Sequence, residues 1–161
     1  MSFDRIVMAA SVLLACAIPA SAQDMGFDVN VTLSKKAAAK LKAEKEKIVV
    51  FASYYGDPKS SAEKHANEIG QISVSPEDED VEIAGTGGRA HISGAKVDKK
   101  TLNWVEGDVS VNVNVASARK SGSDNLLACD FIDGPVSNVQ KAPVTLHCAL
   151  IEENYDTELK P

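Results

Sequence analysis

The sequence predicts an all-β protein, a two-sheet antiparallel β-sandwich of seven to eight strands with one or two short helices. Two segments, residues 27–33 and 108–116, alternate strictly between apolar and polar side chains, as a strand with one buried face does. Shorter apolar segments follow at the spacing of a sandwich, with Gly, Pro, Asn and Asp between them. A chain of 161 residues, 44% of them hydrophobic, is too apolar to be disordered and too short for two ordinary domains.

The first 22 residues have the three parts of a secretory signal peptide. Arg5 precedes an apolar run over residues 6–15, Pro19 ends it, and Ala20-Ser21-Ala22 supplies the small residues of a cleavage site. Cleavage before Gln23 would leave residues 23–161 as a single exported domain. We therefore expect a periplasmic or secreted bacterial protein.

A lipoprotein is the alternative for the same segment. Leu13-Leu14-Ala15 precedes Cys16 as in a lipoprotein signal, and Cys16 would then become the lipid-bearing N-terminus. The apolar run is too short to cross a bilayer and no later stretch is longer, so we predict no transmembrane segment in the mature chain. The net charge of −6 argues against a nucleic-acid partner.

The first part of the mature chain combines strands with short helical segments. After the first strand, Ser34 is placed to cap a helix over residues 35–47, which is rich in Ala, Lys and Glu. Residues 48–55 begin with four apolar side chains and predict a central strand, closed by a turn at residues 56–58. Residues 60–70 fit either a short helix or a polar loop.

The rest of the chain predicts strands and turns alone. The expected strands are residues 71–75, 81–84, 89–93, 108–116, 126–132 and 144–151, and the tail after them is expected to fray. The glycines of residues 85–88 predict a hairpin rather than a dinucleotide-binding loop, because an extended segment and not a helix follows them. This succession of short strands favours an immunoglobulin-like or transthyretin-like sandwich.

Two cysteines remain in the mature chain, and they predict one disulfide. Cys129 and Cys148 form an even pair in a protein with an export signal. Alternation places both side chains on the core-facing side of a strand, and their spacing is not that of a Cys-x-x-Cys redox motif. A bridge over this separation would stabilise the fold by about 3 kcal/mol in the chain-entropy model.

The remaining residues show no complete catalytic or metal-binding pattern. His65, His91 and His147 are too scattered for a copper or zinc ligand set, and the acidic run at residues 77–80 lacks the spacing of a calcium loop. Ser117-Ala118-Arg119-Lys120 has a Ser-x-x-Lys spacing and Ser123-Asp124-Asn125 follows it, which resembles the motifs of penicillin-binding proteins and class A β-lactamases. The two motifs almost touch, the Ser ends a strand and not a turn into a helix, and no Lys-Thr-Gly follows, so we do not predict that activity. We predict no catalytic residue, metal or cofactor, and a small metal-dependent or hydrolytic periplasmic enzyme is the alternative.

Aromatic residues near loops are the candidate contacts. Tyr54 and Tyr55 stand beside the predicted turn at residues 56–58, and Trp104 lies in an irregular stretch. The leading hypothesis is a non-enzymatic binding module that holds a partner protein, a small ligand or an envelope component with the end loops of the sandwich. A small inhibitor is one form of it, and a lipid-anchored structural protein of the envelope is a further alternative.

Intact mass tests the export and disulfide predictions together. Protein recovered from its native compartment should begin at Gln23 and be two hydrogens lighter than the reduced chain. Mass spectrometry before and after reduction measures both. Incorporation of labelled palmitate at Cys16, or free thiols in the unreduced protein, would contradict them.

Overall fold

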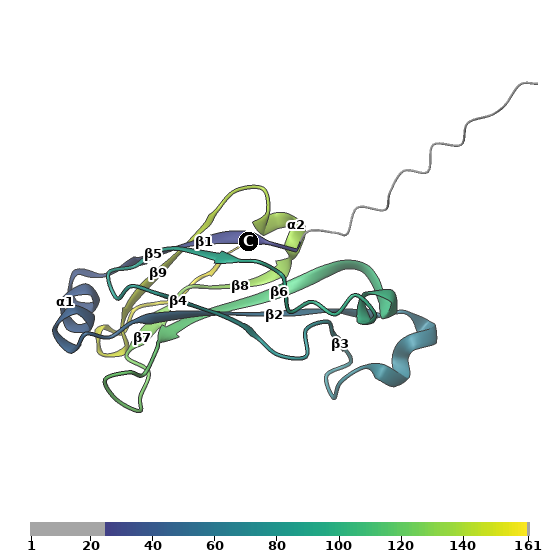
Figure 1. Ribbon diagram of the computed structural model, residues 1–161, viewed down its shortest axis with the longest axis horizontal. Helices are drawn as coiled ribbons and strands as arrows, with labels where there is room; N and C mark the ends of the chain where they lie inside the picture. Colours follow the sequence, from purple (N-terminus) through teal and green to yellow (C-terminus); the bar gives the residue numbers. More distant parts are fainter. Residues whose placement is uncertain (1–24, 161) are drawn as a thin grey trace, which may run out of the picture.

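The computed structural model describes residues 25–160, and within them the chain forms two β-sheets around one core (Figure 1). Sheet A has the strand order β5 (Gly88–Ile92), β1 (Phe27–Leu33), β9 (Val144–Leu150) and β7 (Leu127–Cys129). Sheet B has the order β10 (Leu159–Lys160), β8 (Phe131–Pro135), β6 (Val105–Ser117), β2 (Ile48–Pro58) and β3 (Ile72–Ser73), and β4 (Glu79–Ile83) also pairs with β2. The predicted signal peptide and Cys16 lie outside the described residues.

The helical elements are short. They are α1 (Lys35–Glu44), α2 (Val136–Val139) and the 3₁₀ helices η1 (Ser60–His65), η2 (Thr101–Trp104) and η3 (Ile151–Glu153). Figure 1 shows α1 at one end of the molecule. Within residues 25–160, no helix has both the length and the hydropathy needed to cross a membrane.

Both sheets are mixed, which corrects the prediction of a purely antiparallel sandwich. β1 pairs with β9 in parallel, and β8 pairs with β10 in parallel, whereas the other pairings are antiparallel. A parallel pair needs a long connection, and most of the described chain lies between β1 and β9. Alternation in a sequence is the same for either strand direction, so it could not distinguish the two.

The alternation of apolar and polar residues correctly predicts β1 and β6. The apolar side chains of both sheets point inward and form the core. The buried side chains of sheet A include Val29, Val31, Ile92 and Leu146, and those of sheet B include Val50, Val111, Val113 and Ile132. β2 continues through the predicted turn at residues 56–58, with an irregularity between Tyr55 and Asp57. Gly56 permits this, because a Cβ there would lie 2.4 Å from Cγ1 of Val105.

Helix α1 begins as predicted and ends earlier. The hydroxyl of Ser34 accepts a hydrogen bond from Ala37 N at 3.0 Å, and Ala37 and Leu41 are buried against the core. Lys45 then adopts a left-handed conformation with φ of 54°, which ends the helix before the next residue turns inward. That residue, Glu46, is buried and accepts from Lys120 N at 3.1 Å and from Ser121 N at 2.7 Å.

The glycine-rich segment at residues 85–88 connects the two sheets and is not a hairpin. β4 before it belongs to sheet B, and β5 after it belongs to sheet A. A Cβ at Gly85 would lie 2.1 Å from the carbonyl oxygen of Glu46, and Gly87 has a φ of 79° with its missing Cβ 2.6 Å from Val31 O. The backbone of other segments approaches so closely that these positions require glycine. A hairpin would require glycine as well, so the sequence pattern does not distinguish a hairpin from a connection between two sheets.

The predicted disulfide joins Cys129 of β7 to Cys148 of β9, and the two residues are direct register partners. The strand predicted over residues 126–132 is instead two strands, because the chain leaves sheet A after Cys129 and enters sheet B at Phe131. Asp130 stands at the crossing. The bridge therefore holds sheet A together next to the point where the chain changes sheets.

Asp130 is 1% exposed, and its carboxylate binds β9 and the C-terminal tail. It accepts from His147 N at 3.1 Å, from the Tyr155 hydroxyl at 2.8 Å and from Glu158 N at 3.0 Å, and Lys160 Nζ lies 3.5 Å away. Burial alone would raise the pKa of Asp130, but these hydrogen bonds outweigh it and hold the pKa below its ordinary value. They also order the tail, which the sequence predicted to fray.

Replacing Asp130 with Asn should lower the free energy of unfolding at pH 7 by about 2–3 kcal/mol, because the amide cannot accept from all these donors. The folded-state pKa is lowered, so the contribution of the carboxylate is complete above its ordinary pKa of 3.8 and is lost as the pH falls through the folded-state value. Urea unfolding at several pH values measures both effects. The exposed Asp156→Asn variant is the control, and equal stability of the two variants would contradict the expectation.

Candidate functional site

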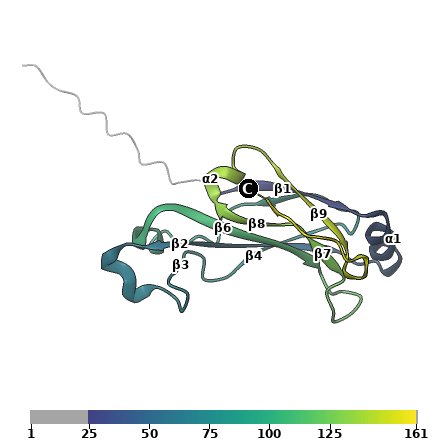
Figure 2. The same ribbon diagram turned by 180° about the vertical axis from the view of Figure 1, so that it is seen from behind.

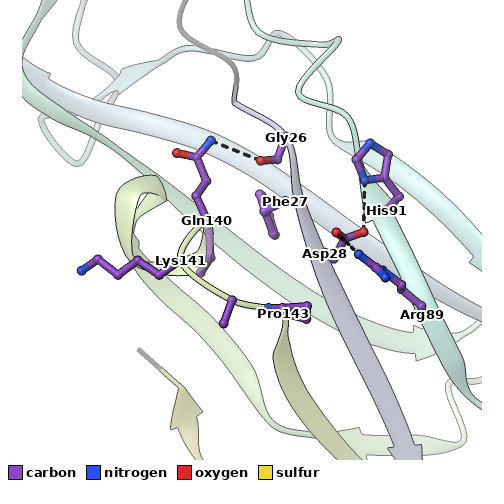
Figure 3. Close-up of a pocket in the computed structure, with 10 residues that line it drawn as sticks. Gly26, Phe27, Asp28, Arg89, His91, Gln140, Lys141 and Pro143 are labelled. Atoms are coloured by element: carbon purple, nitrogen blue, oxygen red, sulfur yellow. Dashed lines mark hydrogen bonds and ion pairs between the residues drawn. The ribbon is translucent and has the colours of Figure 1, made fainter.

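A cleft of about 370 Å³ opens at one end of sheet A (Figure 3). Its walls are the start of β1, the end of β5 and the segment 139–143 between α2 and β9. The cleft follows from the register of the sheet. β1 and β5 pair as far as Phe27, whereas β9 begins only opposite Val29, at Val144. Pro143 precedes that position and cannot donate a backbone hydrogen bond, so the pairing stops there and the chain diverges.

Three charged or polar side chains meet on the β1–β5 wall of the cleft. Asp28 faces outward because its neighbours Phe27 and Val29 are buried, and the register places it opposite His91. The Arg89 guanidinium donates to Asp28 Oδ2 at 2.5 Å, and His91 Nδ1 lies 3.1 Å from Asp28 Oδ1. Figure 3 shows both partners reaching Asp28 from β5.

The Arg89 guanidinium fixes the charge of this group. Its hydrogen bond to Asp28 lowers the pKa of that carboxyl to about 2, and the bond to His91 adds to the effect. The same pairing raises the pKa of Arg89. Both groups are therefore fully ionised at neutral pH, and their charges compensate each other within the cleft.

The opposite wall adds a second cation and no second carboxylate. Figure 3 shows the Lys141 side chain on this wall pointing away from Asp28 and Arg89, and its ammonium donates to Asn138 Oδ1 at 3.1 Å. Gln140 Nε2 donates to Gly26 O at 3.2 Å and ties this wall to the start of β1. With Asp28 as the one carboxylate among the lining residues, the cleft carries a net positive charge on a protein whose net charge is −6.

Arg89 can bind a further partner. Asp28 takes one of its five N–H groups, and 63% of the side-chain surface is exposed. His91 uses Nδ1 toward Asp28 and leaves Nε2 on the solvent side, with 67% of its side chain exposed. The planar guanidinium, already oriented by Asp28, is suited to the two oxygens of a carboxylate or phosphate.

The three aromatic residues predicted as contacts do not form one site. Tyr54 is 1% exposed, and its hydroxyl donates to Met25 O at 2.9 Å. Tyr55 points to the other side of sheet B, where its hydroxyl donates to Asp133. Trp104 stacks on His65 with ring centroids 4.0 Å apart. Because β2 continues past Tyr55, alternation sends the two tyrosines to opposite faces.

Asp28 and Arg89 are not among the residues that the sequence predicts for a site, and His91 is not assigned to this one. Each occupies a polar position on a strand, which is the pattern of any solvated face. Asp28 and Arg89 are 61 positions apart, and alternation does not tell which strands are neighbours. The sequence does show that Asp28 faces outward, because it is one of the polar residues that alternate with apolar ones over residues 27–33.

The acidic run at residues 77–80 is divided between different environments. Glu79 turns inward and accepts from Ser93 N and from Ser93 Oγ at 2.7 Å, whereas Glu77 pairs with Lys96 at 2.8 Å on the surface. Across residues 25–160, no three His, Cys, Asp or Glu side chains are grouped so that they could hold a metal ion.

Comparisons with known proteins add no relative. No protein-family model, curated protein or solved structure matches this chain.

Titration of Asp28 tests the geometry of the cleft. In the Arg89→Gln variant the pKa of Asp28 should rise from about 2 toward its ordinary value of 3.8, because its main hydrogen-bond donor is lost. Carboxyl carbon NMR shifts recorded against pH measure this, with the exposed Lys99→Gln as a control of equal charge change. The ion pair stabilises the fold fully above about pH 4, and this contribution is lost as the pH falls through 2. An unchanged Asp28 pKa would show that Arg89 does not hold it.

Proposed function

We propose that the protein is an exported, non-enzymatic binding module and that the cleft on sheet A binds an anionic group of its ligand, a carboxylate or a phosphate. The observation that carries this proposal is the oriented Arg89 guanidinium, exposed beside His91 in a cleft of net positive charge. The cleft lies where β1 and β5 meet the α2–β9 connection, which agrees with binding by end loops of the sandwich.

The size and lining of the cleft favour binding over catalysis. A volume of about 370 Å³ is within the range of small-ligand sites and also suits the carboxyl end of a partner chain. Asp28 and His91 form a pair of the kind that activates a nucleophile, but the lining residues include no Ser, Thr or Cys. A small inhibitor that captures an acidic group of its target is one form of this proposal.

The proposed location outside the cytosol has one support in the structure. The Cys129–Cys148 disulfide is typical of proteins in oxidising compartments. It favours a periplasmic or secreted protein. We retain cleavage before Gln23 as the proposed processing, with the lipid-anchored form at Cys16 as the alternative. We also retain an immunoglobulin-like or transthyretin-like sandwich as the interpretation of the fold, which two sheets around one core support.

A titration with inorganic phosphate and with succinate tests the cleft. Amide NMR shifts should move at Arg89, His91 and Lys141 with both anions, because both present oxygen pairs to the guanidinium. Arg89→Gln should weaken binding about tenfold or more, and Lys141→Gln should weaken it less.

The control is Lys99→Gln, which removes an equal charge from an exposed loop away from the cleft. It should bind like the wild-type protein if the cleft and not the net charge is responsible. Shifts that do not map to the cleft, or equal affinity of the Arg89→Gln and Lys99→Gln variants, would overturn the proposal.

A further inference from the structure

The outer face of sheet B is a second surface with an unusual composition. β2 and β6 lie side by side along the molecule, as Figure 2 shows, and their outward residues are solvent-accessible while the alternating valines are buried. We call the outward residues of β2, β6 and their neighbouring strands the outer ladder: Phe51, Ser53, Tyr55, Asp80, Asn112, Asn114 and Asp133.

The register places these side chains in rows across the strands. Phe51 of β2 is opposite Asp80 of β4 on one side and Asn114 of β6 on the other. Two residues further along β2, the next row joins Ser53 to Asn112, which in turn is opposite Asp133 of β8. The following row brings Tyr55 opposite Ser110. Aromatic rows therefore stand on both sides of a row of polar groups.

Contacts within the outer ladder hold its polar groups in place. Asn114 Nδ2 donates to Asn112 Oδ1 at 2.5 Å, and the Tyr55 hydroxyl donates to Asp133. The hydroxyl of Ser53 donates to Asp78 at the margin of the face. Because these side chains stand on paired strands and bind each other, the face is ordered before any ligand arrives.

A shallow hollow of about 250 Å³ adjoins Phe51 at one end of the outer ladder. Its floor is apolar, formed by Val49, Phe51 and Ala116, and its rim includes Asp80 and Arg119. An apolar floor with hydrogen-bonding groups at its rim fits a ring that has one apolar face and polar groups at its edge.

Sugar rings have this combination of an apolar C–H face and peripheral hydroxyls. Phe51 and Tyr55 are four residues apart on β2, or about 13 Å, which allows them to contact different rings of one extended chain. Between them, the amides and carboxylates can donate to and accept from hydroxyl groups. Asp80 and Asp133 are exposed carboxylates and would repel a polyanion.

We propose that the outer ladder binds a neutral, extended glycan, with sugar rings packed on Phe51 and Tyr55 and hydroxyls bound by the amides and carboxylates between them. This inference is independent of the anion cleft, which lies on sheet A and is proposed to bind an anionic group, whereas the outer ladder would bind a neutral chain. Failure of one proposal therefore leaves the other intact.

Calorimetry with hexamers of β-1,4-linked glucose and of β-1,4-linked N-acetylglucosamine tests the proposal, because both chains are neutral and extended. At least one hexamer should bind. Polygalacturonate, which is anionic, should bind the outer ladder less tightly than that hexamer does. Phe51→Leu should weaken binding about fivefold or more, because it keeps an apolar side chain and removes the ring face.

A double variant, Asn112→Ala with Asn114→Ala, should weaken binding to a similar extent without removing core contacts. The matched control is Asn30→Ala, which removes a strand asparagine from the outer face of sheet A. Thermal unfolding by circular dichroism confirms that each variant is folded. The proposal is overturned if neither hexamer binds, if the outer-ladder variants bind like Asn30→Ala, or if polygalacturonate binds the Arg89→Gln variant, whose anion cleft is disabled, more tightly than the neutral chains do.

Discussion

The buried carboxylate of Asp130, next to the Cys129–Cys148 bridge, is the constraint on which the rest of the arrangement depends. It lies where the chain leaves sheet A for sheet B, and it accepts from the backbone of β9 and from the C-terminal tail. The disulfide links β9 to β7, and the hydrogen bond from His147 N to the Asp130 carboxylate links β9 to the residue between β7 and β8. β1 pairs along β9, and the segment that forms one wall of the cleft ends at the first residue of β9. The position of the cleft therefore depends on how β9 is held.

Asp130 also shows why the sequence predicted one strand where two exist. Leu127, Cys129 and Phe131 share one phase of alternation, as a single strand would require. In the structure Ile132 is buried and Phe131 faces the outer side, so the phase reverses at the crossing. A polar residue between apolar neighbours looks the same whether it faces solvent or a buried set of donors. Only the hydrogen-bond donors, which come from distant parts of the chain, distinguish a buried Asp130 from a solvent-exposed one.

The elements that the sequence predicted well depend on local chemistry. Ser34 caps α1 by accepting a hydrogen bond from Ala37 N, three residues further on. The alternating valines of β6 indicate which face of that strand is buried, and the even pair Cys129 and Cys148 indicates a disulfide. Strand direction, strand neighbours and therefore the cleft are non-local. The pairing of β1 with β5 could not be predicted from alternation, although alternation does place Asp28 and Arg89 on exposed phases. The fold class was thus partly accessible from sequence, and the candidate site was not.

The two surfaces have one structural origin. Every strand that places a valine in the core must place its next residue outside, so the packing of the core also fixes the rows of outward side chains. On sheet A this alternation brings Asp28, Arg89 and His91 together, and on sheet B it aligns Phe51 with Asp80 and Asn114. Side chains positioned in this way lose little further conformational freedom when a ligand binds, which lowers the entropic cost of recognition. A single core can therefore support two faces with different sets of outward side chains, one on each sheet.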